Sequence, residues 1–222
     1  MKLRIINTAD GSQTLYNTEM EEQYHSMNGA LTEANYVYIE KGYLSHKSEN
    51  PTVFEVGFGT GLNCLLTSLS SEKQKRPTTY FTIEKYPLDK KIIQQLKYGE
   101  NISNEAQDIF EKIHSCKWNS PIEISQYFTL IKLQADLLKD DLKEVANCDI
   151  IYFDAFGPDK QPELWQPQVF QKIYSITTVN GIFVTYSAKG EVRRQLTKCG
   201  YEMERLPGPP GKLHMLQGIK KV

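Results

Sequence analysis

Cysteine pairs, long apolar runs and an excess of charge of either sign are all lacking in this sequence. Its 222 residues include four cysteines, none in a Cys-x-x-Cys pair, so we expect free packed thiols and neither a metal site nor a disulfide framework. No apolar stretch approaches the ~20 residues that a membrane-spanning helix needs. The formal net charge is −1, which gives no overall attraction to nucleic acid or membranes. We therefore expect a soluble, cytoplasmic protein in which any nucleic-acid site is a local patch.

Residues 52–65, TVFEVGFGTGLNCL, predict a ligand site. Strand-type residues lead into three glycines at alternate positions, Gly57, Gly59 and Gly61, and the start of an amphipathic helix follows. Glycines at such a turn let the backbone approach a ligand closely, and the first helical N–H groups point into the same space. Glu55 and Asn63 flank the turn and can bond backbone or cofactor groups.

The spacing of these glycines narrows the class of ligand. The turn lacks the Gly-x-Gly-x-x-Gly spacing of dinucleotide binders and the Lys-Ser/Thr of phosphate-binding loops. Its Gly-x-Gly-x-Gly spacing is typical of S-adenosylmethionine-dependent methyltransferases, although a plain tight turn explains the triad alone equally well.

From residue 51 onward, strand and helix patterns alternate. The hydrophobic pattern predicts strands over residues 52–56, 79–84, 128–134, 149–154 and 181–187, with a closing pair over 201–206 and 214–219. It predicts helices over residues 62–70, 88–98, 105–114, 137–146, 167–176 and 191–199. Such alternation indicates an α/β fold with a doubly wound, mainly parallel sheet. In these sheets ligands bind beyond the carboxyl ends of the strands, so functional residues should follow strands directly.

The first fifty residues read as an N-terminal extension that packs on a core domain formed by residues 51–222. Residues 3–6 and 14–16 can pair as a hairpin around the turn at Asp10-Gly11-Ser12. A helical pattern follows over residues 18–34 and contains the polar triplet Tyr24-His25-Ser26. On spacing alone, this triplet is a helix face with a partly buried tyrosine.

Three acidic residues stand where predicted strands end: Glu84, Asp136 and Asp154. An acid at such a place caps the following helix as often as it binds a ligand. Glu84 can accept both hydroxyls of a ribose, and Asp136 precedes the apolar pair Leu137-Leu138. Because all three come in succession behind a glycine turn, we expect them to surround one site.

The segment after the fourth of these strands, residues 154–165, reads DAFGPDKQPELW. It resembles the DGFxPxKxPxxW signature of the methyltransferase domain of MnmC and of its stand-alone form, MnmD, which act on the wobble uridine of certain tRNAs. Further segments resemble the same family in order along nearly the whole chain: residues 10–16, 24–31, 57–63, 84–88, 185–194 and 208–212. Ala155 stands where the family usually has glycine, and Leu213-His214 where relatives often carry Arg-Glu.

The resemblance implies the class I, Rossmann-like methyltransferase fold with S-adenosyl-L-methionine as cofactor. It implies a cofactor site formed by Glu55, Gly57, Phe58, Gly59, Gly61, Asn63, Glu84, Asp136, Leu137 and Asp154. Asp154 would be the catalytic residue, orienting the substrate amine and stabilising the positive charge that develops on nitrogen. The substrate would be the primary amine of 5-aminomethyl-2-thiouridine at the tRNA wobble position.

Contacts with tRNA are expected at a basic patch and at residues 154–165. From Lys189 onward the chain has eight basic side chains against three acidic ones, a pattern that also fits a solvated helix face. Phe156 and Trp165 can stack on an extruded base or pack against the next helix. The expected substrate-binding residues are Tyr16, His25, Phe156, Lys160, Trp165, Lys189, Arg193, Arg194 and Lys212.

Two other functions fit the sequence. A class I methyltransferase for a small-molecule or protein amine would need the cofactor residues but no basic patch. A cofactor-binding module would work with a separate flavin-dependent oxidase, because 222 residues leave no room for the oxidase half of MnmC. A tRNA methyltransferase of this size would likewise depend on another enzyme for its aminomethyl uridine.

Overall fold

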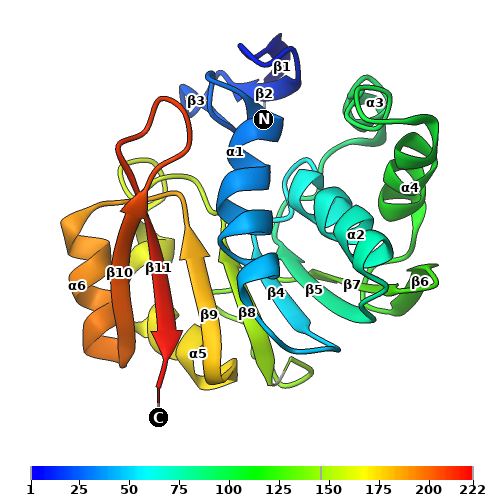
Figure 1. The fold of residues 1–222 in the computed structure, drawn as a ribbon. Coiled ribbons are helices and arrows are strands. Elements are labelled where there is room, and N and C mark those ends of the chain that lie inside the picture. The colour runs from blue at the N-terminus through cyan, green and yellow to red at the C-terminus, as the bar shows by residue number, and fades with distance from the viewer. Residues whose placement is uncertain (1, 146, 222) are drawn as a thin grey trace.

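The computed structural model describes residues 2–145 and 147–221, and over these residues an eight-stranded sheet forms the centre of the molecule (Figure 1). The strand order is β10-β11-β9-β8-β4-β5-β7-β6. The central strands are parallel: β4 (Thr52–Val56), β5 (Thr78–Glu84), β7 (Phe128–Gln134), β8 (Cys148–Phe153) and β9 (Thr177–Thr185). The edges are antiparallel: β6 (Pro121–Ser125) pairs with β7, and the hairpin of β10 (Tyr201–Pro207) and β11 (His214–Lys220) pairs with β9. The expected doubly wound sheet is confirmed.

Strand order reverses at β4. The next strand in sequence, β5, lies on one side of β4, whereas β8 lies on the other side. The connections leaving β4 and β8 therefore diverge, and a crevice opens beyond the carboxyl ends of these two strands.

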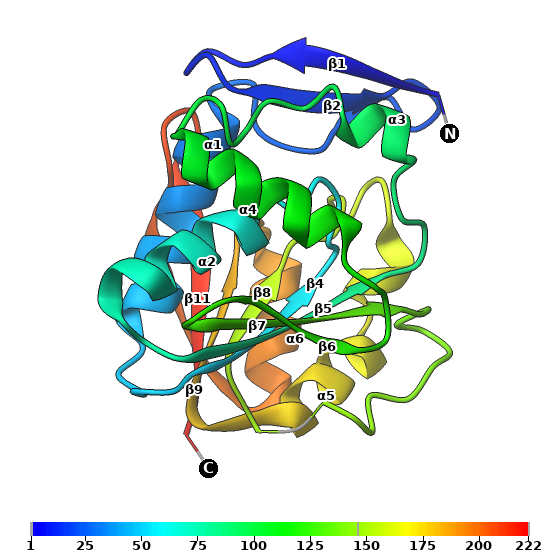
Figure 2. The same cartoon turned by 90° about the vertical axis from the view of Figure 1, so that its right-hand side faces the viewer.

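Helices cover both faces of the sheet (Figures 1 and 2). One face carries α2 (Leu62–Gln74) and α4 (Asn104–Ser115), and the other carries α5 (Pro167–Ile176) and α6 (Gly190–Cys199). Because side chains alternate along a strand, neighbouring residues enter different cores: Val53 joins the core under α2 and α4, and Phe54 joins the core under α5 and α6.

The N-terminal segment begins with the expected hairpin of β1 (Leu3–Asn7) and β2 (Gln13–Asn17), to which β3 (Glu22–Gln23) adds a third strand. These strands lie across the carboxyl ends of the central sheet (Figure 2). The helix expected over residues 18–34 begins only at α1 (Ala30–Ala34). Asn17 is the physical reason, since its side-chain oxygen accepts the N–H groups of Glu19 and Met20 and closes a turn.

After α1 the chain continues as a π-helix, η1 (Asn35–Glu40), and a short 3-10 turn, η2 (Tyr43–Ser45). Ala30 and Val37 belong to the same apolar core as α2. This segment therefore packs directly against the central sheet, and the domain boundary at residue 50 stays a prediction.

Two other expected helices differ in the structure. The prediction of a helix over residues 137–146 is wrong for residues 137–145, which form turns and irregular chain. Ala146 lies outside the described residues. The Lys172 ammonium donates to the carbonyl oxygens of Leu137 and Asp140, which a helix would pair with N–H groups four residues further on. The helix over residues 88–98 is reduced to α3 (Lys90–Ile93). No helix in the described part of the chain is long and apolar enough to cross a membrane.

Candidate active site

A cavity of about 400 Å³ opens at the switch point between β4 and β8. Residues at or just beyond the carboxyl ends of β4, β5, β7 and β8 line it, among them Gly57, Glu84, Asp136 and Asp154. The N-terminal segment and the loop after β8 complete its walls, with Asn17, Met20, Tyr24, His25, Phe156 and Leu164. The size and mixed lining are those of a small-molecule site.

The glycine turn after β4 fits the close approach of a ligand. Gly57, Gly59 and Gly61 have φ angles of +90°, +49° and +74°, a region that side chains rarely adopt. A Cβ atom on Gly57 would lie 2.8 Å from the carbonyl oxygen of Asp154, so the turn packs directly on the end of β8. Gly57, Phe58 and Gly59 line the cavity, whereas Gly61 does not and is the N-cap of α2.

Glu84 and Asp136 face the cavity from the ends of β5 and β7. Glu84 accepts the N–H of Gly59 at 3.1 Å and that of Tyr86 at 2.8 Å, so it also holds the glycine turn. Asp136 forms an ion pair with Lys85 at 3.0 Å, and this pair holds the pKa of Asp136 below its ordinary value. Leu137 adds an apolar surface beside Asp136.

Asp154 presents a carboxylate that is held on both oxygens. The Tyr38 hydroxyl donates to Oδ1 at 2.5 Å, and the Asn63 amide donates to Oδ2 at 2.8 Å. Burial raises the pKa of Asp154 to about 6, and these two hydrogen bonds oppose the rise. Near pH 7 the group is therefore mostly ionised.

Glu55 lies beneath Asn63 rather than on the cavity wall, because β4 buries it completely. Its Oε1 accepts the Asn63 amide at 3.2 Å, and burial raises its pKa to about 8. One amide thus joins two carboxyl groups, Glu55 and Asp154, and burial raises the pKa of both. In this structure Glu55 supports Asn63, and its expected contact with the cofactor stays a prediction.

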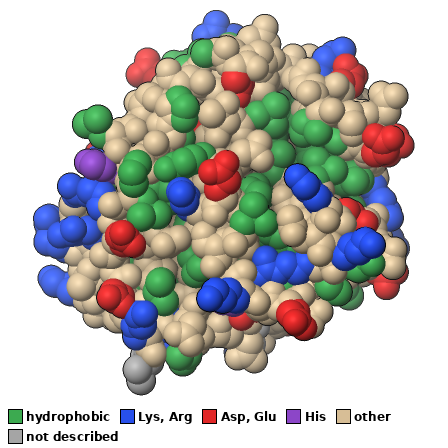
Figure 3. Space-filling view, in the orientation of Figure 1, with side chains coloured by type: hydrophobic (Ala, Val, Ile, Leu, Met, Phe, Trp, Pro, Cys, Tyr) green, Lys and Arg blue, Asp and Glu red, His purple; other side chains and the backbone are tan. Residues whose placement is uncertain are grey.

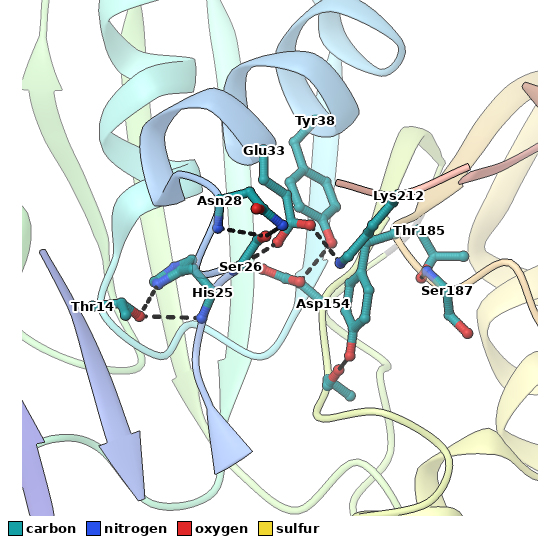
Figure 4. A network of polar contacts seen from close by, with 12 residues as sticks. Thr14, His25, Ser26, Asn28, Glu33, Tyr38, Asp154, Thr185, Ser187 and Lys212 are labelled. Carbon is teal, nitrogen blue, oxygen red and sulfur yellow. Dashed lines mark hydrogen bonds and ion pairs between the residues drawn. The ribbon is translucent and has the colours of Figure 1, made fainter. Parts of the chain in front are cut away.

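A second polar group adjoins Asp154 on the side of the C-terminal hairpin (Figure 4). Lys212, in the loop between β10 and β11, forms an ion pair with Glu33 of α1. Its ammonium lies 4.2 Å from the centroid of the Tyr186 ring, and the Tyr186 hydroxyl donates to the carbonyl oxygen of Ala155. An expected phosphate contact of Lys212 would have to share its ammonium with Glu33.

Three expected substrate residues do line the cavity: His25, Phe156 and Lys160. His25 Nδ1 lies 2.8 Å from Thr14 Oγ1, and burial lowers its pKa to about 4, so it is neutral at pH 7. Phe156 makes an edge contact with Tyr24, with ring centroids 4.9 Å apart. Lys160 donates to the carbonyl oxygen of Met20 at 2.9 Å and thereby joins the loop after β8 to the N-terminal segment.

Tyr16 and Trp165 are not at the cavity. Tyr16 lies on β2, where the Arg4 guanidinium covers its ring at 5.5 Å. Trp165 is only 3% exposed, packs against Phe153 and donates from Nε1 to the carbonyl oxygen of Phe156 at 2.7 Å. Of the two roles open to Trp165, base stacking and helix packing, the structure favours packing.

The basic patch lies at one end of the molecule. Lys and Arg side chains gather at the left edge of Figure 3, over the region of α6 and β10 in Figure 1. Arg193 and Arg194 are exposed on α6, while Lys189 forms an ion pair with Asp159 of the loop after β8. That contact links the patch to the loop that forms one wall of the cavity.

Sequence reasoning missed Tyr38, the residue that contacts Asp154 most closely. It also missed Glu33 and the turn at Asn17–Met20 as parts of the site. Tyr38 and Asp154 are 116 positions apart, and no spacing in the sequence links them.

The cavity and its lining define a class of protein. A glycine turn that tolerates no Cβ, acidic side chains at successive strand ends and a parallel sheet fit a nucleoside-containing cofactor, with Glu84 and Asp136 as polar contacts. The architecture is that of the class I S-adenosyl-L-methionine-dependent methyltransferases.

The family follows from comparison with known proteins. The model of an S-adenosyl-L-methionine-dependent methyltransferase family matches residues 97–221, more than half of the chain, and the chain belongs to this family. The matched region contains Asp154 and the basic patch, while the glycine turn precedes it. S-adenosyl-L-methionine is accordingly the cofactor.

Individual relatives confirm the resemblance to MnmC. The chain is 28% identical over 220 residues to the tRNA 5-methylaminomethyl-2-thiouridine biosynthesis bifunctional protein MnmC of Nitrosospira multiformis, covering 92% of this chain and 35% of that protein. It is 29% identical over 217 residues to the protein of the same name from a Marinomonas species, covering 91% and 32%. The chain thus spans about a third of the length of these relatives.

A solved structure shows the same fold. MnmC2 from Aquifex aeolicus superposes with a TM-score of 0.81 at 23% identity, over 98% of this chain and 70% of that one. Spermidine synthase from Thermotoga maritima shares the fold more distantly, with a TM-score of 0.55 at 13% identity over 100% of this chain and 75% of that one.

Proposed function

We propose that the chain methylates the primary amine of 5-aminomethyl-2-thiouridine at the tRNA wobble position, which gives 5-methylaminomethyl-2-thiouridine. The observation that carries the proposal is the carboxyl group of Asp154, which Tyr38 and Asn63 hold at the wall of the cavity. The names of the MnmC relatives support the choice of nucleoside. The chain spans only about a third of the length of these relatives, so we propose, and do not take from their names, that it acts on the same nucleoside.

Asp154 can serve an amine substrate in two ways. An alkylamine has a pKa of ~10.4, as lysine does, and only its neutral form has a lone pair that can attack the methyl group. Bound S-adenosyl-L-methionine supplies the electrophilic methyl group. The Asp154 carboxylate would accept a hydrogen bond from the amine, which orients the lone pair, and would offset the positive charge that grows on nitrogen.

The pKa of Asp154 bears on where the proton goes. At about 6 it is closer to the pKa of an amine than that of an ordinary aspartate, but it remains several units lower. We therefore assign Asp154 orientation and charge stabilisation, with water taking the proton to bulk solvent.

The basic patch supports a nucleic-acid substrate over a small amine. Arg193 and Arg194 are exposed on α6, which starts just after β9, the neighbour of β8. Lys and Arg patches bind phosphates locally, so a chain of net charge −1 can still hold tRNA. A cytoplasmic location goes with this proposal, as does a separate enzyme, such as an oxidase, that supplies the aminomethyl nucleotide.

The test is incubation of the protein with methyl-labelled cofactor and tRNA from cells arrested at the aminomethyl stage, followed by nucleoside analysis. We expect label in 5-methylaminomethyl-2-thiouridine alone. tRNA that lacks the aminomethyl group, and free alkylamines, serve as control substrates. Equal labelling of free alkylamines would favour the small-molecule alternative, and no labelling of any amine would favour a cofactor-binding module.

A further inference from the structure

Tyr38 reaches Asp154 from the N-terminal segment. Its side chain is 2% exposed, its ring packs on Tyr152 with centroids 5.1 Å apart, and its hydroxyl donates to Asp154 Oδ1 at 2.5 Å. Figure 4 shows the hydroxyl directed at the carboxylate. The ring is thus fixed by packing, and the hydroxyl has a defined partner.

The helix that carries Tyr38 has an uncommon geometry. Residues Asn35–Glu40 form a π-helix directly after α1. A π-turn contains more residues than an α-turn, so it rotates the side chains that follow relative to a regular helix, and such turns occur often at functional sites. Tyr38 lies within η1, and its hydroxyl contacts Asp154.

Several charged or titratable groups face Asp154 from the elements around it. Burial is the largest influence on its pKa and raises it, and Glu33 of α1 acts in the same direction. The hydrogen bonds from Tyr38 and Asn63 lower it, and so does the Lys212 ammonium. Glu55 and Tyr186 also lie within electrostatic reach. Tyr38 is therefore one of two neutral donors that oppose burial.

Tyr38 itself acts only as a donor. Burial, and next the charge of Asp154, raise the pKa of its phenol well above the ordinary value of 10. The hydroxyl keeps its proton over the range in which Asp154 titrates.

We propose that Tyr38 is a positioning residue for Asp154: the hydroxyl of its buried, packed side chain fixes one oxygen of the carboxyl group, Oδ1. Asp154 lines the cavity, where an amine would be received. The role in catalysis rests on the proposed function, whereas the effect on ionisation belongs to the protein alone.

Removal of the hydroxyl tests both parts. In Tyr38→Phe the ring packing on Tyr152 is retained, and the pKa of Asp154 should rise by about one unit because a hydrogen bond to its charged form is lost. The direct readout is a carbon-13 NMR titration of protein labelled at aspartate carboxyl carbons, with the Asp154 signal assigned by its loss in Asp154→Asn. In turnover, the acid limb of the pH–rate profile should move upward by the same amount.

Tyr43→Phe is the matched control. It removes another buried tyrosine hydroxyl from the same segment, one that contacts Thr78 Oγ1 at 2.7 Å. The pKa of Asp154 should stay at its wild-type value in this variant. If Tyr38→Phe does not fold, the wild-type protein still gives a readout: the Tyr38 hydroxyl proton should appear downfield in proton NMR and move upfield in Asp154→Asn.

The outcomes separate the two proposals. An Asp154 pKa that is unchanged or lower in Tyr38→Phe overturns the positioning role, as does a hydroxyl proton that is indifferent to Asp154→Asn. A raised pKa in a protein that methylates no aminomethyl tRNA supports the positioning role and contradicts the proposed function.

Discussion

Lys212 forms an ion pair with Glu33 and so joins the C-terminal hairpin to helix α1 beside Asp154. Glu33 also accepts the N–H of Ser26 at 3.1 Å, and the side chains of Lys212 and Glu33 are 30% and 10% exposed. The pair closes one side of the site with segments from opposite ends of the chain. Lys212 therefore has a structural role in the protein alone, in the absence of tRNA.

Replacement of Lys212 should therefore affect stability. Lys212→Met leaves Glu33 buried without its partner, and we expect a loss of about 1–3 kcal/mol in the free energy of unfolding. Urea denaturation measures it, and the double variant with Glu33→Gln should recover part of the loss. A fully stable Lys212→Met protein with a reduced salt dependence of tRNA binding would instead make Lys212 a phosphate contact.

Glu84→Ala should weaken cofactor binding by roughly 1.5–3 kcal/mol, because a charge-assisted contact to the ribose is lost and the Gly59 N–H loses its acceptor. Isothermal calorimetry with S-adenosyl-L-methionine gives the affinity. Glu123→Ala, at an exposed position on β6, is the control and should bind like wild type. Equal affinity in Glu84→Ala would remove Glu84 from the cofactor site.

The basic patch predicts a salt effect. If Arg193 and Arg194 contact phosphates, each alanine variant should reduce the slope of log affinity against log salt by about one, with cofactor affinity unchanged. Lys143→Ala is a suitable control because Lys143 precedes β8 and lies at the end of that strand opposite Asp154. Slopes identical to that of the wild-type protein would show that Arg193 and Arg194 do not contact phosphates and that α6 is a solvated surface helix.

Glu55 should make stability depend on pH. Its pKa is about 8 in the folded protein against an ordinary 4.5, so between these values the native state holds a proton that the unfolded chain has released. Wild-type stability should fall through this contribution as pH rises across that range. Glu55→Gln does not titrate, and its stability relative to wild type should rise over the same range by on the order of a few kcal/mol.

The measurement is urea unfolding of both proteins at several pH values across that range. His25 and His114, whose pKa values are lowered to about 4 by burial, lose their stabilising effect as pH falls. They are common to both proteins and cancel in the difference. A difference that does not change with pH would show that Glu55 titrates normally.

The parts of the site that could be predicted from the sequence are local. The turn at Gly57–Gly61 and the acids at Glu84 and Asp154 follow strands directly, and a parallel sheet brings such positions together whatever the loops do. The contact of Tyr38 with Asp154 could not be predicted, because Tyr38 lies in a π-helix, whose register a 3.6-residue period does not describe.

Competing side-chain hydrogen bonds explain two of the expected helices that differ in the structure. Leu137, Leu142 and Val145 are buried, and their spacing suited a helix, but Lys172 bonds the carbonyl oxygens of Leu137 and Asp140 that a helix would use. Before β3, the side chain of Asn17 bonds the N–H groups of Glu19 and Met20. Trp165 shows a different limit of prediction from sequence. It belongs to the motif at residues 154–165, but its place in that motif does not show that it packs in the core.

The most direct test of the account is single-turnover methyl transfer to aminomethyl tRNA by Asp154→Asn, measured beside a cofactor titration. Asparagine is nearly isosteric and can still accept a hydrogen bond, yet it cannot offset the positive charge that develops on nitrogen. We expect cofactor binding to be largely retained and the rate to fall on the order of 10²–10³-fold. A fall of less than about tenfold, with the cofactor still bound, would contradict the assignment of Asp154 as the catalytic residue.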